Sequence, residues 1–401
     1  MEAWLQYFAG MDYTPAFIFD IDKLLQRTET IKRILTAQGM QNCSLCYAMK
    51  ANPFLTVILG EALDKLEVCS PGELSICMDQ KVDGRKIVFS GVNKGKKEIE
   101  TALTYGVEIF TVESWKQLEL LRQCAGERNC KISVLIRITS GNQFGMDQDV
   151  VREIILSRDE IPELQIRGIQ YYSGTQKKSD KIVREIQTLN AYLSQLREAG
   201  YRPDILEYGP GLSVDYFGSG EGESPEMLLQ GLRDALDQFP KDIRLVLEMG
   251  RFLTAECGRY LTKVVDKKKN RGQNYCMVDG GIHHVNYYGQ VMGARKPPLL
   301  HLRERDGDFL EVTPEDGAEK WNLCGSLCTV ADVLIRNLEI APPEEADYFL
   351  FEKIGAYSVT EGIYLFLSRD LPKIFFLRDG KPELIRDSYG TWKWNRAERE
   401  G

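Results

Sequence analysis

Between about residue 40 and residue 252, short apolar runs alternate with segments whose apolar positions recur at helical spacing. The helical period is clearest in residues 180–200, where Ile182, Ile186, Leu189 and Leu193 fall on one face. Gly200 then occupies the position of a helix C-cap glycine. The apolar runs are SLCYAM (44–49), LEVC (66–69), KIVFS (86–90), VEIFTV (107–112), KISVLIRI (131–138), IRGIQYY (166–172), DILEY (204–208) and IRLVLE (243–248).

This alternation predicts an α/β fold. Continuous apolar strands separated by helices indicate a parallel sheet covered by helices, and eight is the number of strands that closes into a (β/α)8 barrel. A doubly wound open sheet is the alternative. After about residue 255, short apolar runs broken by DG, GG and PP predict an antiparallel β domain, which the strand-like segment TPAFIFD (14–20) is expected to join. We therefore expect an N-terminal strand region (1–30), a barrel (31–254) and a β-rich domain (255–401).

A barrel of this type gathers its chemistry at the C-terminal ends of its strands. Lys50 follows the first apolar run, and a desolvated lysine can form a Schiff base with a carbonyl cofactor. Glu248 ends the eighth run, where it would face either a protonated ring nitrogen or a salt-bridge partner such as Arg251. The turns YGPGLSV (208–214) and SGT (173–175) offer N–H and hydroxyl groups to an anion.

Composition narrows the classes of partner and compartment. The net charge of −8 argues against binding to nucleic acid or to an acidic membrane surface. The N-terminus has no signal-peptide pattern, and no apolar stretch approaches the length of a membrane span, so we expect a cytoplasmic protein. No metal site is expected, because Cys43 and Cys46 point to opposite faces of a strand and His283 and His284 lack a nearby ligand cluster.

Several motifs together resemble the fold-type III pyridoxal-phosphate decarboxylases, the family of diaminopimelate, ornithine and arginine decarboxylases with an alanine-racemase-like barrel. The resemblance covers nearly the whole chain, and the motifs follow the family order. They are YAMKANP (47–53), EVCSPGEL (67–74), SGVNKG (90–95), TVES (111–114), GIQYYSGTQ (168–176), GPG (209–211), EMGRF (248–252), VDGG (278–281), GSLCTVAD (325–332) and GAY (355–357).

The resemblance implies an amino-acid decarboxylase that uses pyridoxal 5′-phosphate. Lys50 would hold the cofactor covalently, Glu248 would face its ring nitrogen, and Tyr172 would stack on the ring in place of the family's histidine. Cys328 would protonate the α-carbon after carbon dioxide leaves, and the β domain would carry it across a head-to-tail homodimer interface, together with Tyr357, to the partner's barrel. The remaining cofactor-binding residues implied are Thr175, Gly209, Gly211, Gly250, Arg251 and Tyr357.

The departures from the family concern mainly the substrate. Thr329 replaces the acid that binds a distal ammonium, and tyrosine near Tyr287 replaces an arginine that diaminopimelate decarboxylases use. Pro210 replaces the middle glycine of the phosphate turn and removes one N–H donor. Thr329, Tyr287 and Asp332 are the candidate substrate residues. We expect an amino acid whose side-chain end is neutral or masked, for example by a thioester to a carrier protein.

Two other functions use the same barrel. A racemase of this type needs a tyrosine base opposite the lysine, whereas Cys328 in CTVAD is typical of decarboxylases. A non-catalytic regulatory homologue usually loses the lysine or the phosphate turn, whereas Lys50, Glu248 and Cys328 are all present. Decarboxylation is therefore the function that the sequence favours.

Overall fold

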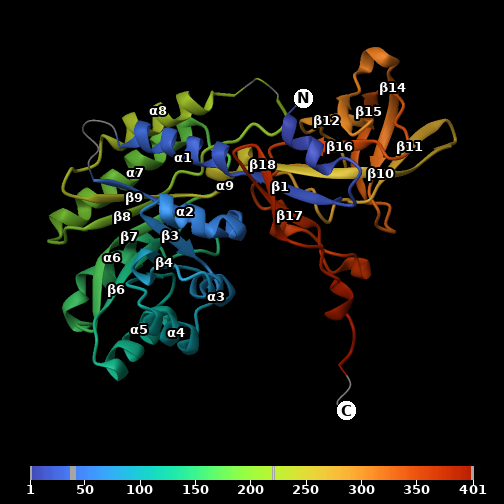
Figure 1. Ribbon diagram of the computed structural model, residues 1–401. Helices are drawn as coiled ribbons and strands as arrows, with labels where there is room; N and C mark the ends of the chain where they lie inside the picture. Colours follow the sequence, from blue (N-terminus) through green and yellow to red (C-terminus); the bar gives the residue numbers. More distant parts are fainter. Residues whose placement is uncertain (1, 37–41, 219, 221, 399–401) are drawn as a thin grey trace. The chain divides into compact units, whose positions relative to one another are not determined.

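The computed structural model describes residues 2–36, 42–218, 220 and 222–398 (Figure 1). One or more residues of each predicted segment (1–30, 31–254 and 255–401) lie outside this description. The chain divides into two compact units. One is the barrel unit, Arg27–Val214 with Glu221–Leu253, and the other is the β unit, Met1–Gln26 with Asp215–Gly220 and Thr254–Gly401.

Eight parallel strands close the barrel in chain order, so the barrel prediction is confirmed and the open-sheet alternative is wrong. Each predicted apolar run forms a strand, with ends shifted by at most a few residues. The strands are β2 (Cys43–Ala48), β3 (Lys65–Val68), β4 (Ile87–Phe89), β5 (Ile109–Val112), β6 (Ile132–Ile138), β7 (Leu164–Tyr172), β8 (Ile205–Gly209) and β9 (Arg244–Met249).

Helices connect successive strands of the barrel (Figure 1). The longest is the one predicted from its apolar stripe, and it ends just before Gly200, whose φ is +84°. That left-handed conformation favours glycine and ends the helix. The connecting helices are α2 (Thr56–Ala62), α3 (Pro71–Asp79), α4 (Lys96–Tyr105), α5 (Trp115–Arg128), α6 (Gln148–Leu156), α7 (Ser179–Glu198) and α8 (Pro225–Leu236). In addition, α1 (Ile21–Leu35) precedes β2 and α9 (Arg251–Thr254) follows β9.

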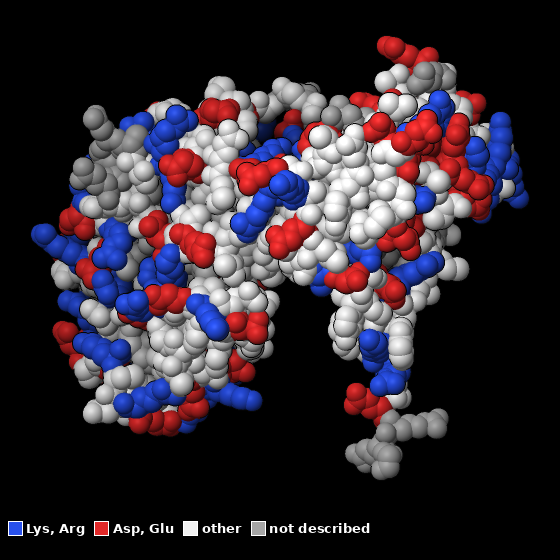
Figure 2. All heavy atoms as spheres, in the orientation of Figure 1, with Lys and Arg blue, Asp and Glu red and all other residues white. Residues whose placement is uncertain are grey.

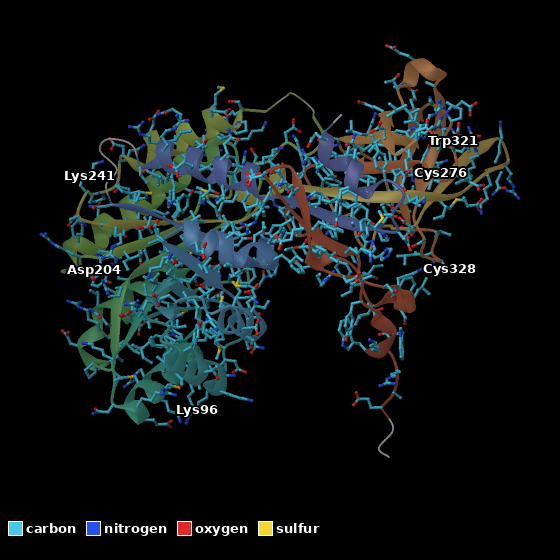
Figure 3. The ribbon with its side chains drawn as sticks, in the orientation of Figure 1. Lys96, Asp204, Lys241, Cys276, Trp321 and Cys328 are labelled. Atoms are coloured by element: carbon cyan, nitrogen blue, oxygen red, sulfur yellow. The ribbon has the colours of Figure 1, made fainter. Side chains whose placement is uncertain are left out.

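The barrel interior is built in layers, because every second residue of a strand points inward. One buried apolar cluster contains Cys46, Val88, Ile109, Leu135, Ile205 and Val246. Two residues further along most of these strands, the side chains are buried and polar: Ser90, Thr111, Arg137, Glu207 and Glu248. Asp204 and Lys241, labelled in Figure 3, precede β8 and β9 and mark the N-terminal end of the barrel. The polar layer therefore lies toward the C-terminal strand ends.

The β unit contains a ten-stranded sheet in which β1 (Ala16–Asp20) takes part, as predicted. Most pairs are antiparallel, but β1 pairs with β17 and β11 pairs with β14 in parallel, which the prediction of an antiparallel domain did not include. The other strands are β10 (Gly258–Asn270), β11 (Gln273–Val278), β12 (Leu299–Arg305), β13 (Asp308–Glu311), β14 (Glu319–Cys324), β15 (Val333–Ile340), β16 (Tyr348–Phe351), β17 (Lys373–Arg378) and β18 (Lys381–Arg386).

The short segment Asp215–Gly220 groups with the β unit although barrel residues flank it in the chain. Tyr216 and Phe217 pack their rings against Tyr287, and Lys353 Nζ donates to the Asp215 carbonyl. These contacts explain why the segment groups with the β unit, whereas the prediction placed residues 31–254 together in the barrel.

Figure 2 shows basic and acidic side chains interspersed over the visible face of the barrel unit. None of the helices in the described part of the chain is both long and apolar enough to span a membrane. The same residues contain no group of three or more His, Cys, Asp or Glu side chains that could hold a metal ion.

Candidate active site

Lys50 lies between two buried carboxylates at the C-terminal end of the barrel. It follows β2 in the short 3₁₀ helix η2 (Met49–Ala51). Its Nζ is 2.5 Å from Glu67 Oε2 on β3 and 3.1 Å from Glu248 Oε1 on β9. Glu67 and Glu248 are only 3% and 6% exposed. β2 pairs directly with both β3 and β9, so barrel closure itself brings the three side chains together.

The two carboxylates compete for one ammonium group. Burial raises the pKa of Glu67, but the charge of Lys50 and its hydrogen bond outweigh burial and lower this pKa below its usual value. Burial raises the pKa of Glu248, and the charge of Glu67 raises it further. Glu248 thus lacks a full cationic partner of its own. A protonated ring nitrogen beside it would supply that partner, as the cofactor implied by the resemblance requires.

Glycines form a close-packed cradle around the same strand ends. Gly211 has φ +60°, and a Cβ there would lie 2.0 Å from the Gly174 carbonyl oxygen. A Cβ on Gly209 would lie 2.5 Å from the ring of Tyr172, and one on Gly250 would lie 2.9 Å from Ala51 Cβ. Side chains are excluded at these positions, so backbone groups can approach an anion closely. The turns therefore fit the phosphate of pyridoxal phosphate.

The predicted ring-stacking residue, Tyr172, ends β7 and is partly buried. Burial raises the pKa of its phenol, and the negative charge of Glu248 raises it further. The side chain therefore stays neutral at physiological pH and can present an apolar face. Thr175 lies three residues after the end of β7, and Arg251 begins α9 just after β9, so the barrel unit brings all of its predicted cofactor-binding residues to the strand ends.

The remaining predicted residues belong to the β unit. Cys328 is exposed in the loop between β14 and β15, apart from the sheet residues Cys276 and Trp321 (Figure 3). Asp332, which is 3% exposed, holds this loop: its carboxylate accepts from the backbone N–H of Ile282 at 2.8 Å and of Leu327 at 2.7 Å. Both carboxylate oxygens of Asp332 are thereby used to shape the loop that presents Cys328.

Two tyrosines of the β unit differ in how they are held. Tyr357 precedes the short helix α10 (Ser358–Glu361) with φ +69°, a conformation that is strained for a tyrosine. The turn is fixed by Gly355, where a Cβ would lie 1.9 Å from the Thr254 carbonyl oxygen. Tyr287 is 1% exposed and donates its hydroxyl to the Glu352 carbonyl at 2.5 Å. Tyr287 therefore offers no cation in place of the arginine that it replaces.

Sequence reasoning did not identify Glu67, Gln170 and Glu207 as part of this site. Gln170 Nε2 lies 3.4 Å from Glu248 Oε2. Glu207 is fully buried, and neither of its carboxylate oxygens has a hydrogen-bond partner among the described residues. A signal was available for the two glutamates, because Glu67 lies inside the apolar run LEVC and Glu207 inside DILEY. A buried strand rarely carries a charged side chain without a functional reason.

We expect the substitution Glu207→Gln to stabilise the protein at neutral pH. Burial raises the pKa of Glu207 well above its usual value, and the charges of Glu248 and Glu67 raise it further. Folding thus favours the protonated form of Glu207. The contribution of this protonated carboxyl to stability is complete below its unfolded-state pKa and is lost as pH rises toward its folded-state pKa. Glutamine has no such loss. The expected gain at about pH 8 is ~1–3 kcal/mol in the free energy of unfolding.

Urea unfolding at about pH 5 and about pH 8 checks this expectation, with Glu153→Gln as the matched exposed control. The difference between Glu207→Gln and wild type should grow with pH, and the control should show little change. If Glu207→Gln is less stable than wild type at both pH values, the ionised form of Glu207 stabilises the fold and the expectation is wrong.

Comparison with known proteins identifies the family of this chain. The family model described as "Pyridoxal-dependent decarboxylase, pyridoxal binding domain" matches residues 22–255. Diaminopimelate decarboxylase of Helicobacter pylori is 26% identical over 411 residues, which cover 97% of this chain and 96% of that protein. L-glutamyl-[BtrI acyl-carrier protein] decarboxylase of Niallia circulans is 26% identical over 348 residues, covering 80% and 79%.

A solved structure shows the same fold. The crystal structure of diaminopimelate decarboxylase from Helicobacter pylori complexed with L-lysine superimposes with a TM-score of 0.83 at 23% identity. The match covers 96% of this chain and 97% of that one. Both units are therefore shared with this neighbour.

Proposed function

This chain belongs to the pyridoxal-dependent decarboxylases, and from that premise we propose that its substrate is an amino acid whose side-chain end carries no free charge. The coarser assignment is established: the protein is an amino-acid decarboxylase that uses pyridoxal 5′-phosphate. The observation that carries the finer proposal is the loop of Cys328, where the neighbouring position is Thr329 and the loop's acid, Asp332, is already bonded to backbone amides.

The residues of the chain divide the chemistry among them. Pyridoxal phosphate, when bound, withdraws electrons from the α-carbon and stabilises the negative charge left by departing carbon dioxide. Lys50 would hold the cofactor, and Glu248 would keep a proton on its ring nitrogen. Glu67 would hold the charge of Lys50 in place through the 2.5 Å contact. Cys328 would deliver a proton to the α-carbon, a role that suits an exposed thiol.

The substrate proposal rests on two charged side chains of the family that this chain replaces with the neutral residues Thr329 and Tyr287. A distal ammonium group that leaves water needs a carboxylate beside it, and threonine supplies only a hydroxyl. A distal carboxylate needs an arginine or lysine, and the phenol of Tyr287 is already bonded to a backbone carbonyl. Neither of the two distal charges of a free diamino diacid would therefore be neutralised by these residues.

A carrier-bound amino acid satisfies the same requirement. A thioester removes the charge of the side-chain carboxylate and moves recognition to the carrier protein's surface. The printed name of the Niallia circulans relative describes such a substrate, and the Staphylococcus aureus relative, 24% identical over 386 residues, is named for a substrate other than diaminopimelate. We propose that this enzyme also acts on a carrier-bound or otherwise masked amino acid, as a homodimer with shared sites.

The test is carbon dioxide release from a panel of substrates: free meso-diaminopimelate, free glutamate, ornithine, lysine and a glutamyl thioester of a carrier protein. We expect wild type to act on the thioester and to leave free diaminopimelate essentially untouched. Turnover of free diaminopimelate at ordinary enzyme rates, ~1 s⁻¹ or faster, would contradict the proposal.

Replacing Thr329 with glutamate should shift the specificity of the enzyme toward free diamines. The new carboxylate would pair with a distal ammonium, so we expect kcat/KM for free lysine or ornithine to rise by about tenfold. Val330→Glu is the matched control, because it adds the same charge one residue further, at a side chain that is 92% exposed. Equal gains in both variants would mean that the effect comes from net charge and not from position 329.

A further inference from the structure

Lys177 is a buried lysine beside the Gly209–Gly211 turn, and the function proposed above assigns no role to it. Its side chain is 1% exposed, although lysine is almost never fully buried without a partner. Nζ donates to Glu185 Oε2 of α7 at 2.6 Å, to Ser173 Oγ at 3.0 Å and to the Gly209 carbonyl at 3.3 Å. One ammonium group thus joins the end of β7, helix α7 and the end of β8.

The network around this lysine is closed and charge-balanced. Glu185 also accepts a hydrogen bond from Tyr208 at 2.9 Å and another from Ser173. Burial lowers the pKa of Lys177, while the hydrogen bond to Glu185 and its charge oppose that shift. A balanced pair of this kind costs less to bury than an isolated cation, and removing one partner leaves an uncompensated charge.

Backbone hydrogen bonds extend the same attachment along the turn. The N–H of Lys177 donates to the Gly211 carbonyl at 2.9 Å, and the N–H of Ser213 donates to the Lys177 carbonyl at 3.2 Å. The carbonyls of Gly209 and Gly211 therefore both point toward residue 177. Since the C=O and N–H of one trans peptide point in opposite directions, the N–H of Leu212 is directed to the other side of the turn.

The identity of residue 210 makes this orientation important. Pro210 has no N–H, so the turn offers one donor fewer to an anion than a run of three glycines would. A carbonyl that rotated toward the anion would also repel it. Anchoring both carbonyls on residue 177 prevents that rotation and places a positive charge behind the turn.

We propose that Lys177 is a positioning residue of the phosphate subsite, which orients the Gly209–Pro210–Gly211 turn so that its remaining donors face the cofactor phosphate. This inference rests on the cofactor assignment above. Lys177 does not touch the cofactor in this role. It acts through the Gly209 carbonyl, and it offsets the donor that Pro210 removes.

The test compares the affinity of the full-length protein for pyridoxal phosphate with its affinity for pyridoxal, which lacks the phosphate. Lys177→Met keeps the length of the side chain and removes its charge. We expect its Kd for pyridoxal phosphate to rise by about tenfold and its Kd for pyridoxal to stay within twofold of wild type. Lys178→Met, at the exposed neighbouring lysine, should leave both constants unchanged.

Two further variants separate positioning from simple destabilisation. Lys177→Arg should recover part of the phosphate preference, and Lys177→Met/Glu185→Gln removes the carboxylate left without a partner, so that a folded protein can be measured. If the folded variants have the same ratio of Kd for pyridoxal phosphate to Kd for pyridoxal as wild type, the inference about Lys177 is wrong and the cofactor assignment still stands. Failure of wild type to bind pyridoxal phosphate at all would instead overturn the cofactor assignment.

Discussion

Replacing Lys50 with alanine is expected to abolish covalent retention of pyridoxal phosphate and to lower the decarboxylation rate by roughly 10³-fold or more. Lys50 is the amine that lies between Glu67 and Glu248 at the strand ends. Borohydride reduction followed by mass spectrometry checks the first part, because it makes the cofactor–lysine bond permanent. Wild type should carry the cofactor mass on the peptide that contains Lys50, and the variant should carry none.

The loss of activity has to be separated from the loss of a charge. Alanine leaves two buried carboxylates without their common cation, which by itself destabilises the barrel. Lys50→Arg keeps a positive charge but has no amine that can form a Schiff base, so it should remain folded and remain inactive. Lys65→Ala, at the opposite end of neighbouring strand β3, should retain the cofactor. Cofactor found on the buried Lys94 of wild type would disprove the assignment of Lys50.

Replacing Cys328 with alanine should lower kcat by ~10²–10⁴-fold while cofactor binding is unchanged, because the change removes a proton donor and no cofactor contact. Steady-state kinetics and the absorption spectrum of the bound cofactor measure the two effects separately. Cys324→Ala is the matched control: this thiol ends β14, four residues earlier, and points to the Asn322 carbonyl. A Cys328→Ala enzyme with full activity would require another proton donor.

Mixing the two inactive variants tests whether the site is shared. If Cys328 serves the barrel of a partner subunit, random exchange of Lys50→Ala and Cys328→Ala subunits should restore roughly a quarter of the wild-type activity, since half of the dimers then hold one intact site. No restoration after demonstrated subunit exchange would mean that each chain supplies both residues to the same site.

Much of the barrel was predictable because local periodicity and barrel geometry agree. The strands are short, mainly apolar runs and the longer helices such as α7 show the other period, so the eight units could be counted from the chain alone. Strand ends then located Lys50 and Glu248, since parallel strands in a closed barrel bring their C-terminal ends together. The contacts between these two residues follow from the pairing of β2 with β9, which closure requires.

What could not be predicted depends on register and on packing between distant segments. Glu207 became important only because barrel closure places it close enough to Glu248 for the two charges to interact. The contact between Lys177 and Gly209 joins residues 32 positions apart, and nothing in the local pattern distinguishes this lysine from its exposed neighbours. The parallel pairing of β1 with β17 likewise joins opposite ends of the chain, which periodicity does not report.

The apolar layer on the N-terminal side of the polar layer also determines from which side a ligand can reach Lys50. Cys46, Leu135 and Val246 are buried in one cluster, and a packed barrel core contains no pore. Nothing can therefore reach Lys50 through the barrel axis from the N-terminal side. Substrate, amine product and carbon dioxide must therefore enter and leave on the C-terminal side, so a ligand that covers that side would block entry and exit alike.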